Sequence, residues 1–294
     1  MSDFPNQLGV HALVWVGDTS PGSVARAVHS TAAAGFDLLE LSLHDAVNLD
    51  VGAARDALVA AGLGVACSRG LAFDADVSSE DPAVVERGAT LLQESLRITH
   101  ELGGTHLTGA LYSALGKYGR PLGDAGRANV VAVLRELAKS AADLDMTLGL
   151  EICNRYETNV VNTAHDALRL ADDVGADNVT IHLDTYHMNI EEDDLVAPVL
   201  AVGDRLGYVH IGENHRGYLG SGHIDFAGFF AALAQVDYRG PITFESFSSA
   251  VVSPGLSNDL AIWRNLWDDG ADLARHARAF LAAQLEAAWS ARSQ

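Results

Sequence analysis

Basic residues are scarce in this sequence, because 19 Lys and Arg stand against 39 Asp and Glu, and the formal net charge is −20. Proteins that dock on nucleic acid need clustered Lys and Arg to contact the phosphates. A chain with this charge repels a phosphate backbone. The composition therefore excludes nucleic acid as an expected partner.

Long hydrophobic runs and cysteines are scarce as well. No stretch approaches the roughly 18 apolar residues of a membrane-spanning helix, and the N-terminal MSDFPNQ lacks the basic and apolar segments of a secretory signal. The two cysteines, Cys67 and Cys153, lie far apart in apolar segments, which fits a reducing compartment better than a disulfide framework. These absences predict a cytoplasmic protein with no membrane partner.

Linkers and nucleotide-binding glycine motifs are also absent. With 7 Pro in 294 residues and no Ser-, Gly- or Pro-rich divider, the sequence predicts a single domain over residues 1–294, with a helical extension from about residue 272. The 48% of hydrophobic residues suffice for a large core and argue against disorder. The turn VWVGDTSPG does not match GxGxxG, which disfavours a doubly wound open sheet.

The sequence does contain a repeating unit: an apolar run, a loop, and an amphipathic helix that ends near a glycine. Gly35, Gly62, Gly103 and Gly175 stand where left-handed helix C-caps are expected. Eight strand–helix units in a chain of this length predict an α/β fold, the (β/α)₈ TIM barrel. The predicted strands are LGVHALVW (8–15), LLELSL (38–43), GVACSRGL (64–71), THLTGALY (105–112), TLGLEIC (147–153), VTIHLDT (179–185), LGYVHIG (ending at 212) and PITFESF (241–247).

Each of the last four strands ends in a lone ionisable residue: Glu151, Asp184, His210 and Glu245. Active sites of TIM barrels lie at these strand ends. A single such residue is most simply a solvated or ion-paired strand end. Four of them in successive strands would repel one another without a cation, and an oxygen-rich set with one nitrogen suits Mn²⁺, Mg²⁺, Co²⁺ or Fe²⁺. We expect a divalent metal site here.

Further polar residues follow these strand ends. Glu157, His187 and Arg216 either line the same pocket or are solvated loop charges, and their spacing does not decide between the two. His11 shares the first strand with Trp15. The acidic run EEDD, residues 191–194, is expected to be the N-terminal turn of a helix, where negative charge suits the helix dipole.

The segments LEICNRYETN, HLDTYHMNIEE, HIGENHRG and ITFESF closely resemble the ketose 3-epimerases, a family of xylose isomerase-like TIM barrels. Among its members, the D-tagatose, D-allulose and especially the L-ribulose 3-epimerases are similar. The resemblance runs in order along most of the chain, up to IWRNLW near the end. It implies a homodimer or homotetramer.

The resemblance also implies roles for individual residues. The family binds one divalent metal per subunit, with Mn²⁺ expected and Co²⁺ or Mg²⁺ as alternatives, at the positions of Glu151, Asp184, His210 and Glu245. It places its two acid/base carboxylates at Glu151 and Glu245. It holds the oxygens at C1 to C3 of the ketose at Glu157, His187 and Arg216. The far end of the sugar is expected to contact Trp15, Cys67 and Phe247.

The activity implied is inversion of C3 in free ketoses through a cis-enediolate. The expected pairs are L-ribulose and L-xylulose, D-allulose and D-fructose, and D-tagatose and D-sorbose. An aldose–ketose or hydroxypyruvate-type isomerase that uses the same metal site is the main alternative. An apurinic endonuclease shares the barrel but is disfavoured by the net charge, and a non-catalytic sugar-binding protein is disfavoured by two carboxylates that flank one metal.

Overall fold

The computed structural model describes residues 4–44 and 46–292. In this part of the chain, eight parallel strands follow one another around a closed barrel in sequence order, and β8 pairs with β1. This confirms the TIM barrel and excludes the open sheet. The strands are β1 (Leu8–His11), β2 (Leu38–Ser42), β3 (Gly64–Ser68), β4 (His106–Gly109), β5 (Thr147–Glu151), β6 (Val179–Asp184), β7 (Leu206–Ile211) and β8 (Ile242–Phe244).

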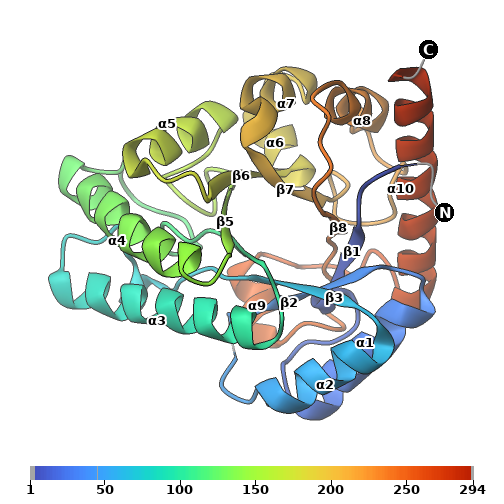
Figure 1. Cartoon of the computed structure of the whole chain (residues 1–294), viewed down its shortest axis with the longest axis horizontal. Helices are drawn as coiled ribbons and strands as arrows, with labels where there is room; N and C mark the ends of the chain where they lie inside the picture. The colour runs from blue at the N-terminus through green and yellow to red at the C-terminus, as the bar shows by residue number, and fades with distance from the viewer. Residues whose placement is uncertain (1–3, 45, 293–294) are drawn as a thin grey trace.

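Helices surround the strands on the outside of the barrel (Figure 1). At Gly35, Gly62, Gly103 and Gly175, φ lies between 67° and 90°, which confirms the predicted left-handed helix ends. The α-helices are α1 (Pro21–Ala33), α2 (Val51–Ala61), α3 (Pro82–Glu101), α4 (Asp124–Ala142), α5 (Ala164–Val174), α6 (Thr185–Glu191), α7 (Val196–Val202), α8 (Phe226–Gln235), α9 (Pro254–Asp259) and α10 (Gly270–Arg292). Short 3₁₀ turns occur at η1 (Ala12–Val14), η2 (Phe73–Ala75) and η3 (Gly203–Arg205).

Local sequence explains where several helices begin. The side chain of Asp81 accepts a hydrogen bond from the backbone N–H of Ala83 and caps α3. The next residue, Pro82, suits the first position of the helix. Thr163 and Asp166 form a reciprocal capping box at the start of α5. These bonds satisfy N–H groups that the helices themselves cannot pair.

The run EEDD only partly behaves as predicted. Glu191 is the last residue of α6, and Glu192 accepts a hydrogen bond from the backbone of Ala164 at the start of α5. Asp194 accepts from the backbone N–H groups of Val196 and Ala197, at the start of α7. The helix-start prediction is therefore wrong for Glu191, because this glutamate completes the preceding helix.

The C-terminal helix α10 begins at Gly270, close to the predicted residue 272, and packs against α8, β1 and β8 (Figure 1). Its contact face carries Leu273, Ala277, Leu281 and Leu285, which recur at every fourth residue and are buried. Each buried leucine of this kind stabilises the fold by about 1.5–3 kcal/mol. Within the described residues, no helix has the length and apolar character needed to cross a membrane.

The barrel interior is unusually polar toward the ends of its strands. Glu40, Thr108, His182 and Tyr208 are fully buried there, and Thr108 lies 2.6 Å from Nδ1 of His182. Gly149 makes room for this pair, since a Cβ at its position would lie 2.5 Å from the Thr108 hydroxyl. Buried polar groups of this kind require partners, and this network leads directly to the strand ends.

Candidate active site

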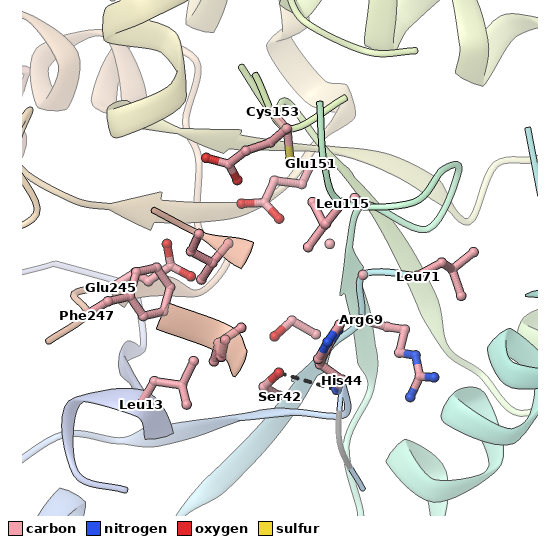
Figure 2. A pocket seen from close by; sticks show the side chains of 18 of the residues that line it. Leu13, Ser42, His44, Arg69, Leu71, Leu115, Glu151, Cys153, Glu245 and Phe247 are labelled. Carbon is pink, nitrogen blue, oxygen red and sulfur yellow. Dashed lines mark hydrogen bonds between the residues drawn. The ribbon is translucent and has the colours of Figure 1, made fainter. Parts of the chain in front are cut away.

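Four ionisable side chains meet at the carboxyl ends of β5 to β8. The carboxylate oxygens of Glu151, Asp184 and Glu245 lie 3.3, 3.5 and 3.6 Å from one atom, Nδ1 of His210. Asp184 and His210 are direct partners in the register of β6 and β7. Figure 2 shows Glu151 and Glu245 directed into one pocket from different strands. The structure thus brings the four predicted metal ligands together.

The donor set fits a divalent cation. Nδ1 of His210 and Oδ2 of Asp184 are buried without a hydrogen bond among the described residues. The other oxygen of Asp184, Oδ1, accepts hydrogen bonds from the backbone N–H groups of Tyr186 and His187 and so caps α6. Oδ2 takes no part in these bonds and faces His210. Bonds of about 2.0–2.2 Å to a shared cation place neighbouring ligands roughly 3–3.5 Å apart. Three carboxylates and one imidazole form a hard, oxygen-rich set.

Burial and neighbouring charges shift the pKa values of these groups. Burial raises the pKa of Glu151 to about 7. Burial would also raise the pKa of Asp184, but the neighbouring His187, His210 and Arg216 outweigh it and hold that pKa below its usual value. For His210, the nearby carboxylates of Glu40 and Glu245 outweigh burial and raise the pKa well above its usual value. The cluster therefore attracts positive charge, as a cation site does.

Glu40 on β2 supports the site from inside the barrel and is absent from the predicted residues. It is fully buried and accepts hydrogen bonds of 2.8 Å from Nε2 of His210 and from the hydroxyl of Tyr208. With the Nε2 proton directed to Glu40, Nδ1 is the nitrogen that faces the carboxylates, where a bound cation would take the place of a second proton. A lone carboxylate inside the apolar run LLELSL is the same kind of signal that indicates Glu151 and Asp184.

The three residues predicted to hold the sugar oxygens also line this pocket, a cavity of about 270 Å³. Nε2 of His187 lies 3.9 Å from Glu151 and 4.0 Å from Asp184. Arg216 forms an ion pair of 2.5 Å with Glu245, and its guanidinium stacks over the rings of Tyr186 and Phe247. Glu157 accepts a hydrogen bond from Asn154. The open question about these residues is answered, because all three lie inside the pocket.

Of the three residues predicted to contact the far end of the sugar, one lines the cavity. Phe247 lines the cavity. Trp15 lies beyond the end of β1, packs on the core and donates a hydrogen bond to Thr31 of α1. Cys67 is fully buried on the outward face of β3, where its thiol contacts Thr99 of α3. Trp15 and Cys67 are therefore outside the cavity lining.

The cavity lining includes residues that the sequence prediction leaves out. Cys153, the other cysteine, lines the pocket beside Glu151, and His11 lies at its floor beside Ser68. Ser42, His44 and Arg69 lie across the pocket from Cys153 in Figure 2. The apolar part of the wall includes Phe247 and also Leu13, Leu71, Phe73, Leu115, Leu256 and Leu260.

The xylose isomerase-like TIM barrel family matches residues 28–284. L-ribulose 3-epimerase of Methylomonas sp. (strain DH-1) is 52% identical over 95% of this chain and 98% of its own length. Ketose 3-epimerase of Arthrobacter globiformis is 49% identical over 96% and 97%. The crystal structure of D-allulose 3-epimerase from Methylomonas sp. in complex with D-allulose superimposes with a TM-score of 0.93, at 50% identity over 96% and 98% of the two chains. Sequence, barrel and pocket together show that this chain belongs to the ketose 3-epimerases, isomerases of the xylose isomerase-like TIM barrel family.

Proposed function

We propose that the protein inverts C3 of free ketoses through a cis-enediolate, with one divalent cation held by Glu151, Asp184, His210 and Glu245. The observation that carries this proposal is the placement of Glu151 and Glu245. They come from β5 and β8, on different sides of the barrel mouth, and both reach within 3.6 Å of the same atom of His210. Two carboxylates so arranged can flank a small sugar.

Inversion requires two proton-transfer groups. The hydrogen at C3 is acidic because the adjacent C2 carbonyl accepts the electron pair that its removal leaves behind. A single base would return a proton to the face from which it came. In our proposal, Glu151 and Glu245 lie on opposite faces of the enediolate, so that one removes the proton and the other supplies one.

The negative charge that develops on the C2 oxygen needs donors already in place. His187 and Arg216 line the pocket beside the two glutamates and supply an N–H group and a guanidinium. A bound divalent cation supplies a Lewis acid that stabilises negative charge on the ketose oxygens. Glu157 can accept hydrogen bonds from the hydroxyl groups at the same end of the sugar.

The substrate class follows from the relatives and the pocket. The similar proteins are named for L-ribulose, D-allulose or ketoses in general. The wall around Leu13, Leu115 and Phe247 is apolar, and Ser42, His44 and Arg69 line the same cavity and can hydrogen-bond to sugar hydroxyl groups. We therefore propose free ketopentoses and ketohexoses, with Mn²⁺ as the cation and Co²⁺ or Mg²⁺ as alternatives.

A cytoplasmic homodimer or homotetramer completes the proposal. Cys67 and Cys153 are free and buried, which fits a reducing compartment. Trp263 is 72% exposed, and a large aromatic side chain in that position suits a subunit interface. Light scattering coupled to gel filtration measures the mass, and a monomer at micromolar concentration contradicts the oligomer.

A ketose panel tests the proposed activity. The protein is stripped of metal, reconstituted with Mn²⁺ and incubated with L-ribulose, D-allulose, D-fructose and D-tagatose, and the products are separated by chromatography. We expect the C3 epimer of at least one ketose. Formation of aldoses alone would support the isomerase alternative, and no product with any ketose would contradict the proposal.

A further inference from the structure

Asn154, three residues beyond β5, contacts two of the proposed sugar-binding groups at once. It is 1% exposed. Its Nδ2 lies 2.9 Å from Oε1 of Glu157 and 2.9 Å from Nδ1 of His187. Its backbone N–H also donates to Nδ1 of His187, at 3.1 Å. One buried side chain thus joins a carboxylate and an imidazole that line the pocket.

The orientation of this amide is set by its partners. Oδ1 of Asn154 accepts a hydrogen bond of 2.9 Å from the backbone N–H of Tyr156. The NH₂ group must then face Glu157 and His187, and its two protons match two acceptors. The reverse orientation would place Oδ1 against the carboxylate of Glu157 and NH₂ against an N–H donor. Both polar atoms of the amide therefore have compatible partners in one orientation only.

The same contacts define which nitrogen of His187 carries the proton. A backbone N–H is always a donor, so Nδ1 of His187 is an acceptor, and the neutral ring carries its proton on Nε2. Nε2 lies 3.9 Å from Glu151 and 4.0 Å from Asp184, and neither distance is a hydrogen bond. The Nε2–H group of His187 therefore faces the cavity at a point where a sugar oxygen can accept its hydrogen bond.

His187 and His210 consequently have opposite roles. Nε2 of His210 donates to Glu40, and its Nδ1 faces the carboxylates without a hydrogen bond, in the place of a metal ligand. His187 instead presents a protonated nitrogen, which cannot ligate a metal. The partner on the far side of each ring, Glu40 or Asn154, determines what the ring offers to the pocket.

We propose that Asn154 is a positioning residue that keeps His187 a hydrogen-bond donor at Nε2 and holds Glu157 beside it, so that both meet the same end of the ketose. This inference rests on the proposed function, since the donor needs a ketose oxygen to meet. Asn154 itself lines no part of the cavity among the described residues. It acts only through its two neighbours.

Two substitutions separate this role from a packing role. Asn154→Asp keeps the shape but places a carboxylate oxygen against Glu157 and against Nδ1 of His187. The backbone N–H on Nδ1 remains, and the carboxylate oxygen competes with it by accepting a proton from Nδ1, which shifts the ring proton toward Nδ1. Asn154→Ala removes the side-chain bonds to Glu157, His187 and Tyr156 but leaves the backbone N–H on Nδ1. We expect Asn154→Asp to be the more damaging, with kcat lowered about 10- to 100-fold and KM changed less. A packing role predicts the reverse order, because alanine leaves a void.

Asn162 provides the matched control in the same loop. Its amide donates to the backbone carbonyls of Cys153 and Thr158 and contacts neither Glu157 nor His187. Asn162→Asp and Asn162→Ala are expected to affect the melting temperature without changing the proton position on His187. If they lower kcat as much as the Asn154 variants, the loop as a whole is responsible and the proposal is wrong.

A measurement on the imidazole itself completes the test and needs no substrate. Long-range ¹H–¹⁵N correlation spectra of the wild-type protein, with the signal assigned by loss in His187→Gln, should show His187 protonated at Nε2, and in Asn154→Asp the proton should move to Nδ1. A wild-type ring protonated at Nδ1, or an unchanged ring in Asn154→Asp, overturns the proposal even if a variant folds poorly. Absence of epimerase activity in a wild-type protein with the expected Nε2 proton would instead refute the proposed function alone.

Discussion

Glu40 and His210 share a buried hydrogen bond of 2.8 Å, and this bond leaves the other nitrogen of the imidazole facing three carboxylates. A carboxylate behind a ligating histidine orients the ring and makes it a better ligand. Glu40→Gln retains the shape but weakens the acceptor. We expect the affinity for Mn²⁺ to fall about 10- to 100-fold.

Calorimetric titration of the metal-free protein with Mn²⁺ measures this effect. Tyr208→Phe is the matched control, since it removes the other hydrogen bond to Glu40 and leaves the bond to His210. The control should bind Mn²⁺ nearly as well as the wild type. Equal loss in both variants would assign the effect to the core of the barrel and not to His210.

Each of the two proposed acid/base glutamates should exchange the C3 proton of one epimer. Glu151→Gln and Glu245→Gln are expected to lose C3 inversion by about 10²- to 10⁴-fold. The remaining carboxylate can still exchange the C3 hydrogen on its own face, so each variant should incorporate deuterium from the solvent into only one of the two epimers. The metal content is measured in parallel, because both residues are also proposed ligands. Near-normal inversion in either variant with metal bound contradicts the two-base assignment.

His187 should influence turnover more than metal binding. Its protonated Nε2 lies about 4 Å from the nearest carboxylate oxygens of Glu151 and Asp184, so it is placed as a donor and not as a ligand. His187→Gln is expected to lower kcat while the Mn²⁺ dissociation constant stays within about twofold of the wild type. Loss of metal from this variant would show that the ring is part of the metal site.

The buried thiol of Cys67 predicts how the folding stability depends on pH. Burial raises its pKa to about 12, whereas a thiol in the unfolded chain titrates near 8.5. The stabilisation linked to this thiol is therefore complete below about pH 8.5 and is lost as the pH rises toward 12. Urea unfolding measures the free energy of unfolding at pH 7 and at pH 10. The decrease between the two pH values should be smaller in Cys67→Ala than in the wild type. An equal loss in the two proteins would place the titrating group elsewhere.

The fold and the four strand-end residues are visible in the sequence because each signal is local. A lone Glu, Asp or His inside an apolar run marks a strand end, and strand ends converge in a barrel. The same logic could have found Glu40. The prediction that Trp15 lines the pocket is wrong because β1 ends at His11, four residues earlier than the apolar run suggests.

The prediction that Cys67 lines the pocket is wrong for a related reason. Side chains alternate between the two faces of a strand, so that Ser68 reaches the cavity and Cys67 faces α3. A shift of one residue reverses the prediction. The role of Asn154 lies beyond such patterns, because it depends on contact with His187, a residue 33 positions away.

The proposed function requires this pocket to move a proton at C3 with the help of a divalent cation. Its most direct measurement is deuterium incorporation when the Mn²⁺-loaded protein acts on L-ribulose or D-allulose in deuterated water, followed by NMR of both sugars. We expect label at C3 of substrate and product, lost on chelation and restored by Mn²⁺. Label at C1 or C2, or C3 exchange that chelation leaves unchanged, would contradict the proposed function.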